Sequence, residues 1–422
     1  MQNKNHKLSS IEAIFSSISG AGPLVNFAIL ISYAYIYSGN AMFLSFIFAF
    51  ILFILFFNSV YNFSTKKVGK GAYYLFFEEN KYKKFYIYLY FIYSFSSIIS
   101  LITFISFILT GYIININYIF YFIIFITLSS FIFLLIKHNL KLSIKYTSIG
   151  AILEIIFIIS ITIYLGLNLN YNIKINIPSF NSIFIGGIFS VLIFAGLGSI
   201  ISFGDMIDKP YKTVTKSLLI SSLIEATVFI IASLVLGLFL ENMNYSLNVN
   251  SVIPVFMIIK NLGNYMTFIF LILLINSFIN IIILYTVSLT RTYHRHIEEK
   301  IAFNRIVDYI FIVFLGISLF LLFMIGPLNT FLLTTSIASF NWIIFHDTIN
   351  LELIKGYFKN KKNVIKNFVI PIAAILFSFI MIFFIINSNS FPFNISPIIS
   401  FSVIIFLLIF EKKNYIRKVI KL

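Results

Sequence analysis

The stretch FAGLGS, Phe194–Ser199, lies within an apolar run from Ser182 to Gly204 that is long enough to cross a membrane. Small residues and glycines inside such a run predict a broken helix. In hydrocarbon, broken backbone survives only where protein buries it or where it lines a cavity. A second stretch of this kind, SSISGAGP at Ser16–Pro23, lies in the first apolar run. Interrupted segments at matching places in two halves of a chain are the best sequence indication of a transporter's substrate site.

The composition of the whole chain agrees with a membrane setting. Of 422 residues, 60% are hydrophobic and 10% are charged, whereas soluble domains have about 45–50% apolar and about 25% charged residues. These values exclude a water-soluble globule and a disordered chain. Cysteine is absent, which excludes disulfides, thiolate metal sites and cysteine nucleophiles.

Because a membrane-spanning helix needs about 20 mostly apolar residues, the sequence predicts an all-α polytopic protein with about twelve spans. The predicted spans are Ala13–Tyr37, Ala41–Phe63, Phe85–Tyr112, Tyr118–Ile136, Thr147–Leu167, Ser182–Gly204, Ser217–Leu240, Leu262–Thr290, Ile306–Ile325, Thr330–Phe345, Phe368–Ile386 and Ile395–Phe410.

The loop charges support this count. Threading twelve spans from a cytoplasmic N-terminus places every Lys and Arg on the cytoplasmic side except Lys174 and Lys260. Positive residues gather in cytoplasmic loops, so this alternation predicts both termini inside a multi-pass cell-membrane protein. The net charge of +16 therefore reports topology, and we expect no nucleic-acid partner. The N-terminal segment does not have the pattern of a cleavable signal peptide.

The remaining motifs argue against an enzyme. Neither a P-loop nor a His/Asp cluster at membrane depth is present, so primary ATP-driven pumping and intramembrane catalysis are not expected. His294 and His296, near Glu298 and Glu299, define no metal geometry and are expected in a solvated loop. We expect no cofactor beyond a coupling ion, H⁺ or Na⁺.

The two breaks lie five spans apart and so cross the membrane in opposite directions, as an inverted 5+5 repeat requires. Backbone N–H groups at a half-helix N-terminus favour a carboxylate, and exposed carbonyls suit an amino group or a cation. The pair could thus hold both ends of an amino acid. The alternative is that the glycines only permit close helix packing. The predicted substrate-binding residues are Ser19, Gly20, Ala21, Gly22, Phe194, Ala195, Gly196 and Gly198.

Several segments resemble a known family. Phe194–Lys212, FAGLGSIISFGDMIDKPYK, resembles the sixth span and following loop of amino acid permeases of the amino acid–polyamine–organocation superfamily. The segment Gly71–Tyr74 resembles that family's Gly-Gly-Tyr-Tyr entry to the third span, and Leu289–Tyr293 its Ser-Arg-x-Leu-Tyr end of the eighth span. Leu8–Pro23 resembles its first span. The resemblance covers about residues 8 to 345.

The resemblance implies a leucine-transporter-like fold. It places a cytoplasmic segment at 1–12, two inverted repeats at 13–167 and 182–345, peripheral helices at 368–410 and a basic tail at 411–422. The family's usual Gly-Ser-Gly-Ile reads Gly20-Ala21-Gly22-Pro23 here, and the acidic pair before its proline turn reads Asp205 with Asp208 displaced. These departures leave a transport role intact but do not give the substrate.

The polar residues inside the spans are candidates for coupling and gating. Glu154 and Glu225 are acids within spans, where ionisable groups are functional by default, although either could instead reach the interface or pair with a loop residue. The resemblance places Glu154 beside the coupling-ion region. Ser277 belongs to a polar group on the eighth span. We expect Asp205 to pair with a basic residue of a neighbouring cytoplasmic segment when the inner gate is shut.

The sequence therefore predicts a symporter or antiporter that moves an amino acid or related amine by alternating access, driven by H⁺ or Na⁺. Its partners would be this small-molecule substrate and the lipid bilayer. The rival interpretations are a twelve-span facilitator of two parallel halves that carries a sugar or drug, and a lipid flippase. The short loop after Gly204 counts against the two-halves architecture.

Overall fold

The computed structural model is helical in its described part. It describes residues 7–69, 71, 73–109, 118–138, 140–169, 174–243, 254–297, 301–387 and 394–420, where the backbone forms helices and a single parallel bridge between Leu8 and Ile207. Several sequence predictions lie outside these residues, namely those for Lys4, His6, Tyr112, Glu298, Glu299, Lys300 and Lys421.

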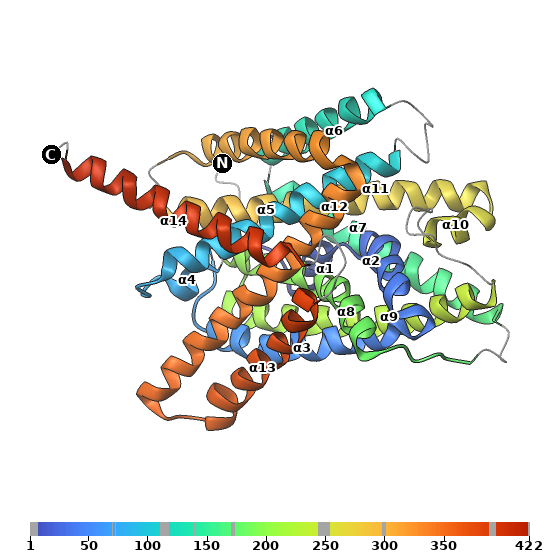
Figure 1. Ribbon diagram of the computed structural model, residues 1–422, viewed down its shortest axis with the longest axis horizontal. Helices are drawn as coiled ribbons and strands as arrows, with labels where there is room; N and C mark the ends of the chain where they lie inside the picture. The colour runs from blue at the N-terminus through green and yellow to red at the C-terminus, as the bar shows by residue number, and fades with distance from the viewer. Residues whose placement is uncertain are drawn as a thin grey trace.

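Several long helices, such as α5, α6 and α11, run roughly along the long axis of the molecule, whereas α13 and α14 lie obliquely to it (Figure 1). In chain order they are α1 (Ser10–Ala21), α2 (Pro23–Ser38), η1 (Gly39–Ala41), α3 (Met42–Ser64), α4 (Tyr74–Phe77), α5 (Lys83–Ile108), α6 (Tyr118–His138), α7 (Leu140–Leu167), α8 (Phe180–Ala195), η3 (Gly196–Met206), α9 (Pro210–Asn242), α10 (Pro254–Asn261), α11 (Asn264–His296), α12 (Phe303–Asn360), η4 (Ile365–Val369), α13 (Ile370–Asn387) and α14 (Ser396–Ile420).

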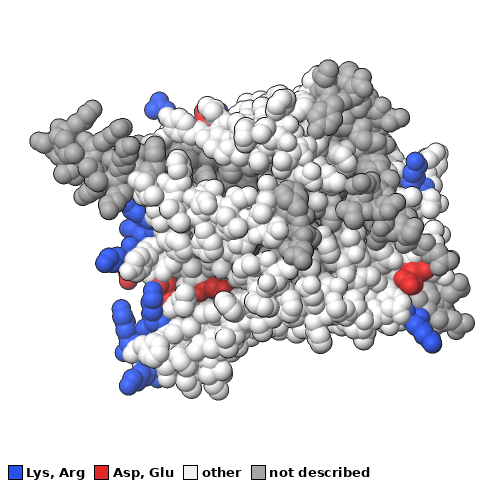
Figure 2. All heavy atoms as spheres, in the orientation of Figure 1, with Lys and Arg blue, Asp and Glu red and all other residues white. Residues whose placement is uncertain are grey.

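Eight helical segments of the described chain are long and apolar enough to cross a membrane, and two shorter apolar helices accompany them. Two of the eight, Ser10–Ser64 and Phe303–Asn360, have 55 and 58 residues. At about 1.5 Å per residue each is nearly three times the length that a bilayer core of about 30 Å needs. Figure 2 shows the charged side chains mostly towards the two ends of the long axis, with a wide uncharged belt between them.

The first break has a clear local cause. Ser9 caps α1, and its side chain and that of Glu12 form a reciprocal capping box. The helix ends where Gly22 adopts a left-handed conformation with φ of 71°, which a residue with a Cβ adopts only at a cost. Pro23 then starts α2 at the first helical position, where its missing N–H leaves no helical bond unmade.

The second break takes a different form. The α-helix of α8 ends at Ala195, and Gly196–Met206 continues as a 3₁₀ helix, η3, that contains Asp205. Eleven residues is long for this tighter and poorer hydrogen-bonding geometry, which marks hinges and strained segments. The sequence predicts a break near Gly196 within a span that continues as far as Gly204. The chain leaves η3 at Met206 and turns at Lys209, which has φ of 48°.

Spans nine and ten form one element with a kink. In α12, Gly326 has non-helical dihedrals (φ 78°, ψ 170°) and Pro327 follows it. Proline removes a backbone donor and clashes with the preceding turn, so the helix bends where the sequence prediction placed a gap before Thr330. The second half of α12 packs Trp342, which is buried, against Phe56 of α3.

Substituting Gly22 with alanine should lower the thermal stability of the purified protein. The left-handed conformation costs a residue with a Cβ about 1–2 kcal/mol, and the added Cβ would lie 1.9 Å from Cδ1 of Ile281. Gly316→Ala is the matched control, since a Cβ there meets no atom within 4 Å and removes glycine's helix penalty of about 1 kcal/mol. A Gly22→Ala protein as stable as Gly316→Ala would contradict this account of the break.

Candidate functional site

The two broken helices touch each other directly. A Cβ built on Gly196 would lie 1.9 Å from the carbonyl oxygen of Gly20, and one on Gly20 would lie 2.3 Å from Oγ of Ser199. The two helix backbones can approach this closely because glycine has no Cβ to separate them. The hydroxyl of Ser17 strengthens the contact, because it donates to the carbonyl of Leu197 at 2.9 Å. Of the predicted substrate-site residues the structure thus brings together Gly20 and Gly196, whereas Phe194 packs against Phe53 of α3.

Glu154 of α7 forms hydrogen bonds with groups at the first break. Its Oε2 accepts hydrogen bonds from the backbone N–H of Leu24 (3.2 Å) and from Oγ of Ser277 (2.6 Å), and its Oε1 lies 3.3 Å from Nδ2 of Asn276. The side chain is buried. Leu24 belongs to the first turn of α2, so the carboxylate occupies the positive end of that helix, where an anion is stabilised.

This arrangement changes the expected use of the first break. The N–H groups of Leu24, Val25 and Asn26 have partners in Glu154, Ser277 and Gly22 respectively. The sequence predicts that backbone N–H groups at this half-helix N-terminus are available to a substrate carboxylate. Instead Glu154, a residue of the protein itself, supplies the anion in this conformation.

The carbonyl side of the break is different. In a continuous helix the carbonyl of Ser19 would accept from residue 23, but Pro23 has no N–H. The N–H of Leu24, which would bond the carbonyl of Gly20, donates to Glu154. The carbonyl of Ala21 accepts from Nδ2 of Asn26 at 2.9 Å. The carbonyls of Ser19 and Gly20 therefore lack helical donors, and that of Gly20 packs against Gly196. A carbonyl at a helix end, such as that of Ser19, suits a hydrogen-bond donor or a cation.

Several buried polar atoms near the breaks have no hydrogen-bond partner within the described chain. They include Oγ of Ser19 and Ser199 and both carboxylate oxygens of Glu225. Glu225 is fully buried on α9 and interacts electrostatically with Glu154. Burying an unpaired charge costs several kcal/mol, so a proton or a cation must accompany this carboxylate. The amide of Asn280 on α11 is also unpartnered.

A small cavity lies against the first break. It has a volume of about 50 Å³ and is lined by Ala21, Asn26, Ser100, Tyr285 and Thr335, together with apolar side chains. Oγ of Ser100 and Oγ1 of Thr335 are hydrogen-bonded at 2.5 Å. Since one water needs about 10–15 Å³ of such space, the cavity has room for a few waters and must enlarge to admit an organic solute.

Tyr73 separates this region from the predicted cytoplasmic side. It precedes α4 and is buried, and a Cβ on Gly198 would lie 2.0 Å from its hydroxyl. A second, smaller cavity is lined by Tyr73, Gly198, Ser199 and His346. The sequence predicts that Gly198 contacts substrate, whereas in the structure it faces the Tyr73 hydroxyl.

Asp205 of η3 and Arg291 of α11 form an ion pair on the same predicted cytoplasmic side. Nη1 of Arg291 donates to Oδ1 of Asp205 at 2.8 Å and to the carbonyl of Ser202 at 2.5 Å. The Arg291 side chain is 10% exposed, and its guanidinium lies 5.3 Å from the ring centroid of Phe203. Asp205 thus has the basic partner on a neighbouring segment that its position predicted. Nearby, Leu8 N–H donates to the carbonyl of Met206 at 2.8 Å.

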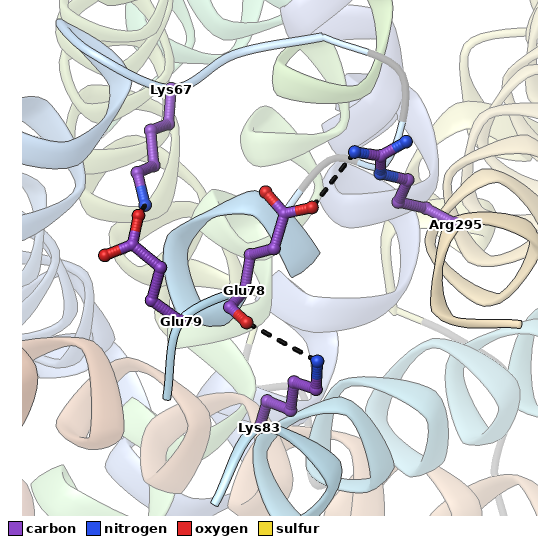
Figure 3. A network of polar contacts seen from close by, with 5 residues as sticks. All are labelled: Lys67, Glu78, Glu79, Lys83 and Arg295. Atoms are coloured by element: carbon purple, nitrogen blue, oxygen red, sulfur yellow. Dashed lines mark hydrogen bonds and ion pairs between the residues drawn. The ribbon is translucent and has the colours of Figure 1, made fainter. Parts of the chain in front are cut away.

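Further ion pairs are formed by the two acidic residues that follow α4, Glu79 with Lys67 of the loop after α3 and Glu78 with Arg295 of α11. Figure 3 shows Arg295 directed at Glu78 and Lys67 directed at Glu79, with N···O distances of 3.0 and 3.4 Å. Nζ of Lys83 lies 3.5 Å from the carbonyl of Glu78. These side chains are more exposed than Arg291, so each pair is worth at most about 1 kcal/mol.

Sequence reasoning missed several of these residues. Asn26 and Tyr285 line the first cavity, whereas Asn276, which bonds Glu154, belongs to the polar group predicted on the eighth span. Tyr73 and Arg291 belong to segments noted only for their family resemblance. A signal for Asn26 existed, since an amide three residues after Pro23 in an apolar run has to find a partner.

Comparison with known proteins supports the fold. Neither a protein-family model nor a curated protein sequence matches the chain. Among solved structures it resembles a mutant of the manganese transporter of Eremococcus coleocola, with a TM-score of 0.60 and 11% identity, over 94% of this chain and 93% of that chain. The chain therefore has the fold of a membrane transporter.

Substituting Gly198 with alanine should slow transport because the added methyl group displaces Tyr73. The new Cβ would collide with the Tyr73 hydroxyl, whereas the next ring atom, Cζ, is 3.0 Å away. Tyr73→Phe combined with Gly198→Ala should therefore recover part of the lost uptake rate in proteoliposomes. If the double variant is as impaired as Gly198→Ala alone, the hydroxyl contact is not the cause.

Removing the charge of Asp205 should loosen the predicted cytoplasmic closure. Asp205→Asn, made with Ser199→Cys in this cysteine-free chain, should speed labelling of that cysteine by a thiol reagent several-fold. Asp208→Asn is the control, because Asp208 forms an exposed pair with Lys7 at 3.2 Å that contributes little. Equal labelling rates in the two variants would assign Asp205 no closing role.

Proposed function

We propose that this protein is a secondary active transporter that works by alternating access. In this proposal the chain crosses the cell membrane twelve times with both termini in the cytoplasm. Ten of these spans form an inverted 5+5 repeat of the leucine-transporter type, as in amino acid permeases of the amino acid–polyamine–organocation superfamily. The observation that supports it best is the contact of two interrupted helices, Gly20 against Gly196, beside a partly polar cavity.

The proposed substrate is an amino acid or a related amine. An ammonium group would fit the carbonyl oxygen of Ser19 at the end of α1, which lacks a helical donor because residue 23 is proline. Asn26, Ser100 and Thr335 offer hydrogen bonds, and the apolar lining suits a hydrocarbon side chain. Because Glu154 occupies the N-terminus of α2, a substrate carboxylate would have to bind elsewhere in the cavity or displace Glu154.

The proposed driving ion is H⁺ or Na⁺, and Glu154 is its acceptor. Protonation of Glu154, or a cation beside it, would weaken its hold on the Leu24 N–H and Ser277 hydroxyl. Those two groups belong to α2 and α11, so ion binding would change how the two helices are joined. A bound ion shifts a conformational equilibrium only through such differential contacts.

The donor set at the breaks favours an organic solute over a transition metal. The side chains lining the first cavity contribute hydroxyls and one amide, and the described residues contain no group of three or more His, Cys, Asp or Glu that could hold a metal. Carboxylates are usual ligands of manganese, and none of the residues that line the first cavity is Asp or Glu. The cargo of the similar manganese transporter is therefore not carried over to this protein.

Replacing Glu154 with glutamine should separate coupling from substrate movement. Purified protein in proteoliposomes should take up a labelled amino acid or amine when a pH or Na⁺ gradient is imposed. Glu154→Gln should abolish accumulation driven by the gradient but keep exchange of labelled for unlabelled substrate, because the cavity is intact. Glu241→Gln, at the far end of α9, is the control and should behave as the wild type.

Two outcomes would contradict the proposal at different levels. Normal gradient-driven accumulation in Glu154→Gln would assign Glu154 a structural role and leave the transporter proposal in place. No uptake or exchange of any amino acid or amine by the wild type would overturn the proposed substrate class.

A further inference from the structure

A basic cavity lies away from the transport site, where α3 and α12 both end. Its volume is about 360 Å³, and its polar lining includes Lys66, Lys67, Asn360, Lys362 and Asn363. No Asp or Glu lines it. Three more lysines are near in sequence, Lys359 in the last turn of α12, Lys361 directly after it and Lys366 in η4. A cavity with several ammonium and amide donors and no carboxylate is suited to an anion.

The turn that shapes the cavity holds an unusual backbone conformation. Lys361 and Asn363 have φ values of 49° and 50°, in the left-handed region that residues with a Cβ rarely adopt. Nδ2 of Asn367 donates to the carbonyl of Lys362 at 2.8 Å and so ties the turn together. Backbone strain of this kind persists where the surrounding structure holds it, often at ligand sites.

The lysines of the cavity are available to a ligand. Lys66 and Lys362 are exposed. Lys67 pairs with Glu79 at 3.4 Å, but the Glu79 side chain is 89% exposed, so the pair is screened and weak. A phosphate could replace Glu79 with little loss.

Apolar side chains beside the cavity point to a membrane location. Phe358 is 63% exposed and Ile365 is 64% exposed, and η4 has no buried residue. Exposed aromatic and branched side chains next to lysines are the pattern of a segment at the headgroup level of a bilayer. The basic cavity thus opens where a lipid phosphate would lie when acyl chains cover Phe358 and Ile365.

We propose that this cavity binds the phosphate group of an anionic phospholipid. Three lysines would supply charge-assisted hydrogen bonds, and Asn360 and Asn363 would bond the headgroup. Basic pockets between helices on the cytoplasmic side bind headgroups through the same chemistry. Inorganic phosphate offers the same charge without acyl chains, so the test has to separate these two sources.

The test measures lipid retention by the full-length protein. Delipidated protein in detergent is titrated with phosphatidylglycerol or with phosphatidylcholine, and bound lipid is counted by native mass spectrometry. We expect preferential binding of phosphatidylglycerol. Lys66→Ala with Lys362→Ala should weaken it roughly 25-fold, at about fivefold per lysine. Lys212→Ala with Lys216→Ala, exposed lysines of α9 outside the cavity, should change it less than twofold.

Two further measurements separate the effect of charge from that of side-chain length, and a lipid from a soluble anion. Lys66→Gln with Lys362→Gln retains most of each side chain's length and should weaken binding equally if charge is the cause. Equal binding of the two lipids, or equal loss in the α9 control, would overturn the proposal. Inorganic phosphate that raises the melting temperature as much as phosphatidylglycerol does would assign the cavity to a soluble anion and overturn the lipid assignment.

Discussion

The structure depends on how two interrupted helices satisfy their backbone groups away from water. An unpaired backbone group in hydrocarbon costs several kcal/mol, so a break in a spanning helix needs partners from elsewhere in the chain. At the first break, α7 supplies Glu154 for the N–H of Leu24, and Asn26 bonds the carbonyl of Ala21. At the second break, Ser17 bonds the carbonyl of Leu197. The helices around the centre are positioned by these few contacts.

The closure on the predicted cytoplasmic side is graded in strength from the centre outward. Tyr73 lies deepest, against Gly198, and the partly buried pair of Arg291 and Asp205 follows. The outermost pairs, such as Lys7 with Asp208, are exposed and contribute little. Opening this side would therefore be opposed mainly by the inner contacts. All of them involve η3 or its neighbours, and a 3₁₀ segment of this kind has fewer good hydrogen bonds to lose than an α-helix.

Much of the fold could be predicted from hydropathy and glycine placement, since these are local signals. The helix break at Gly22–Pro23 and the change of geometry at Gly196 follow from residues that cannot continue a helix. The partners of Glu154 could not be predicted, because Leu24 and Ser277 are 130 and 123 residues away. Gly198 shows the same limit, since its neighbour Tyr73 comes from a loop whose position no periodicity specifies. The twelve-span count and the inverted repeat remain predictions.

The central claim is that substrate binds in the cavity beside the first break, and one cysteine tests it most directly. Ala21 lines the cavity beside the first break, and the chain has no other cysteine. In proteoliposomes containing Ala21→Cys protein, a membrane-permeant thiol reagent should stop uptake, and the transported amine should slow the modification. Full modification of this cysteine with unchanged uptake would contradict the claim.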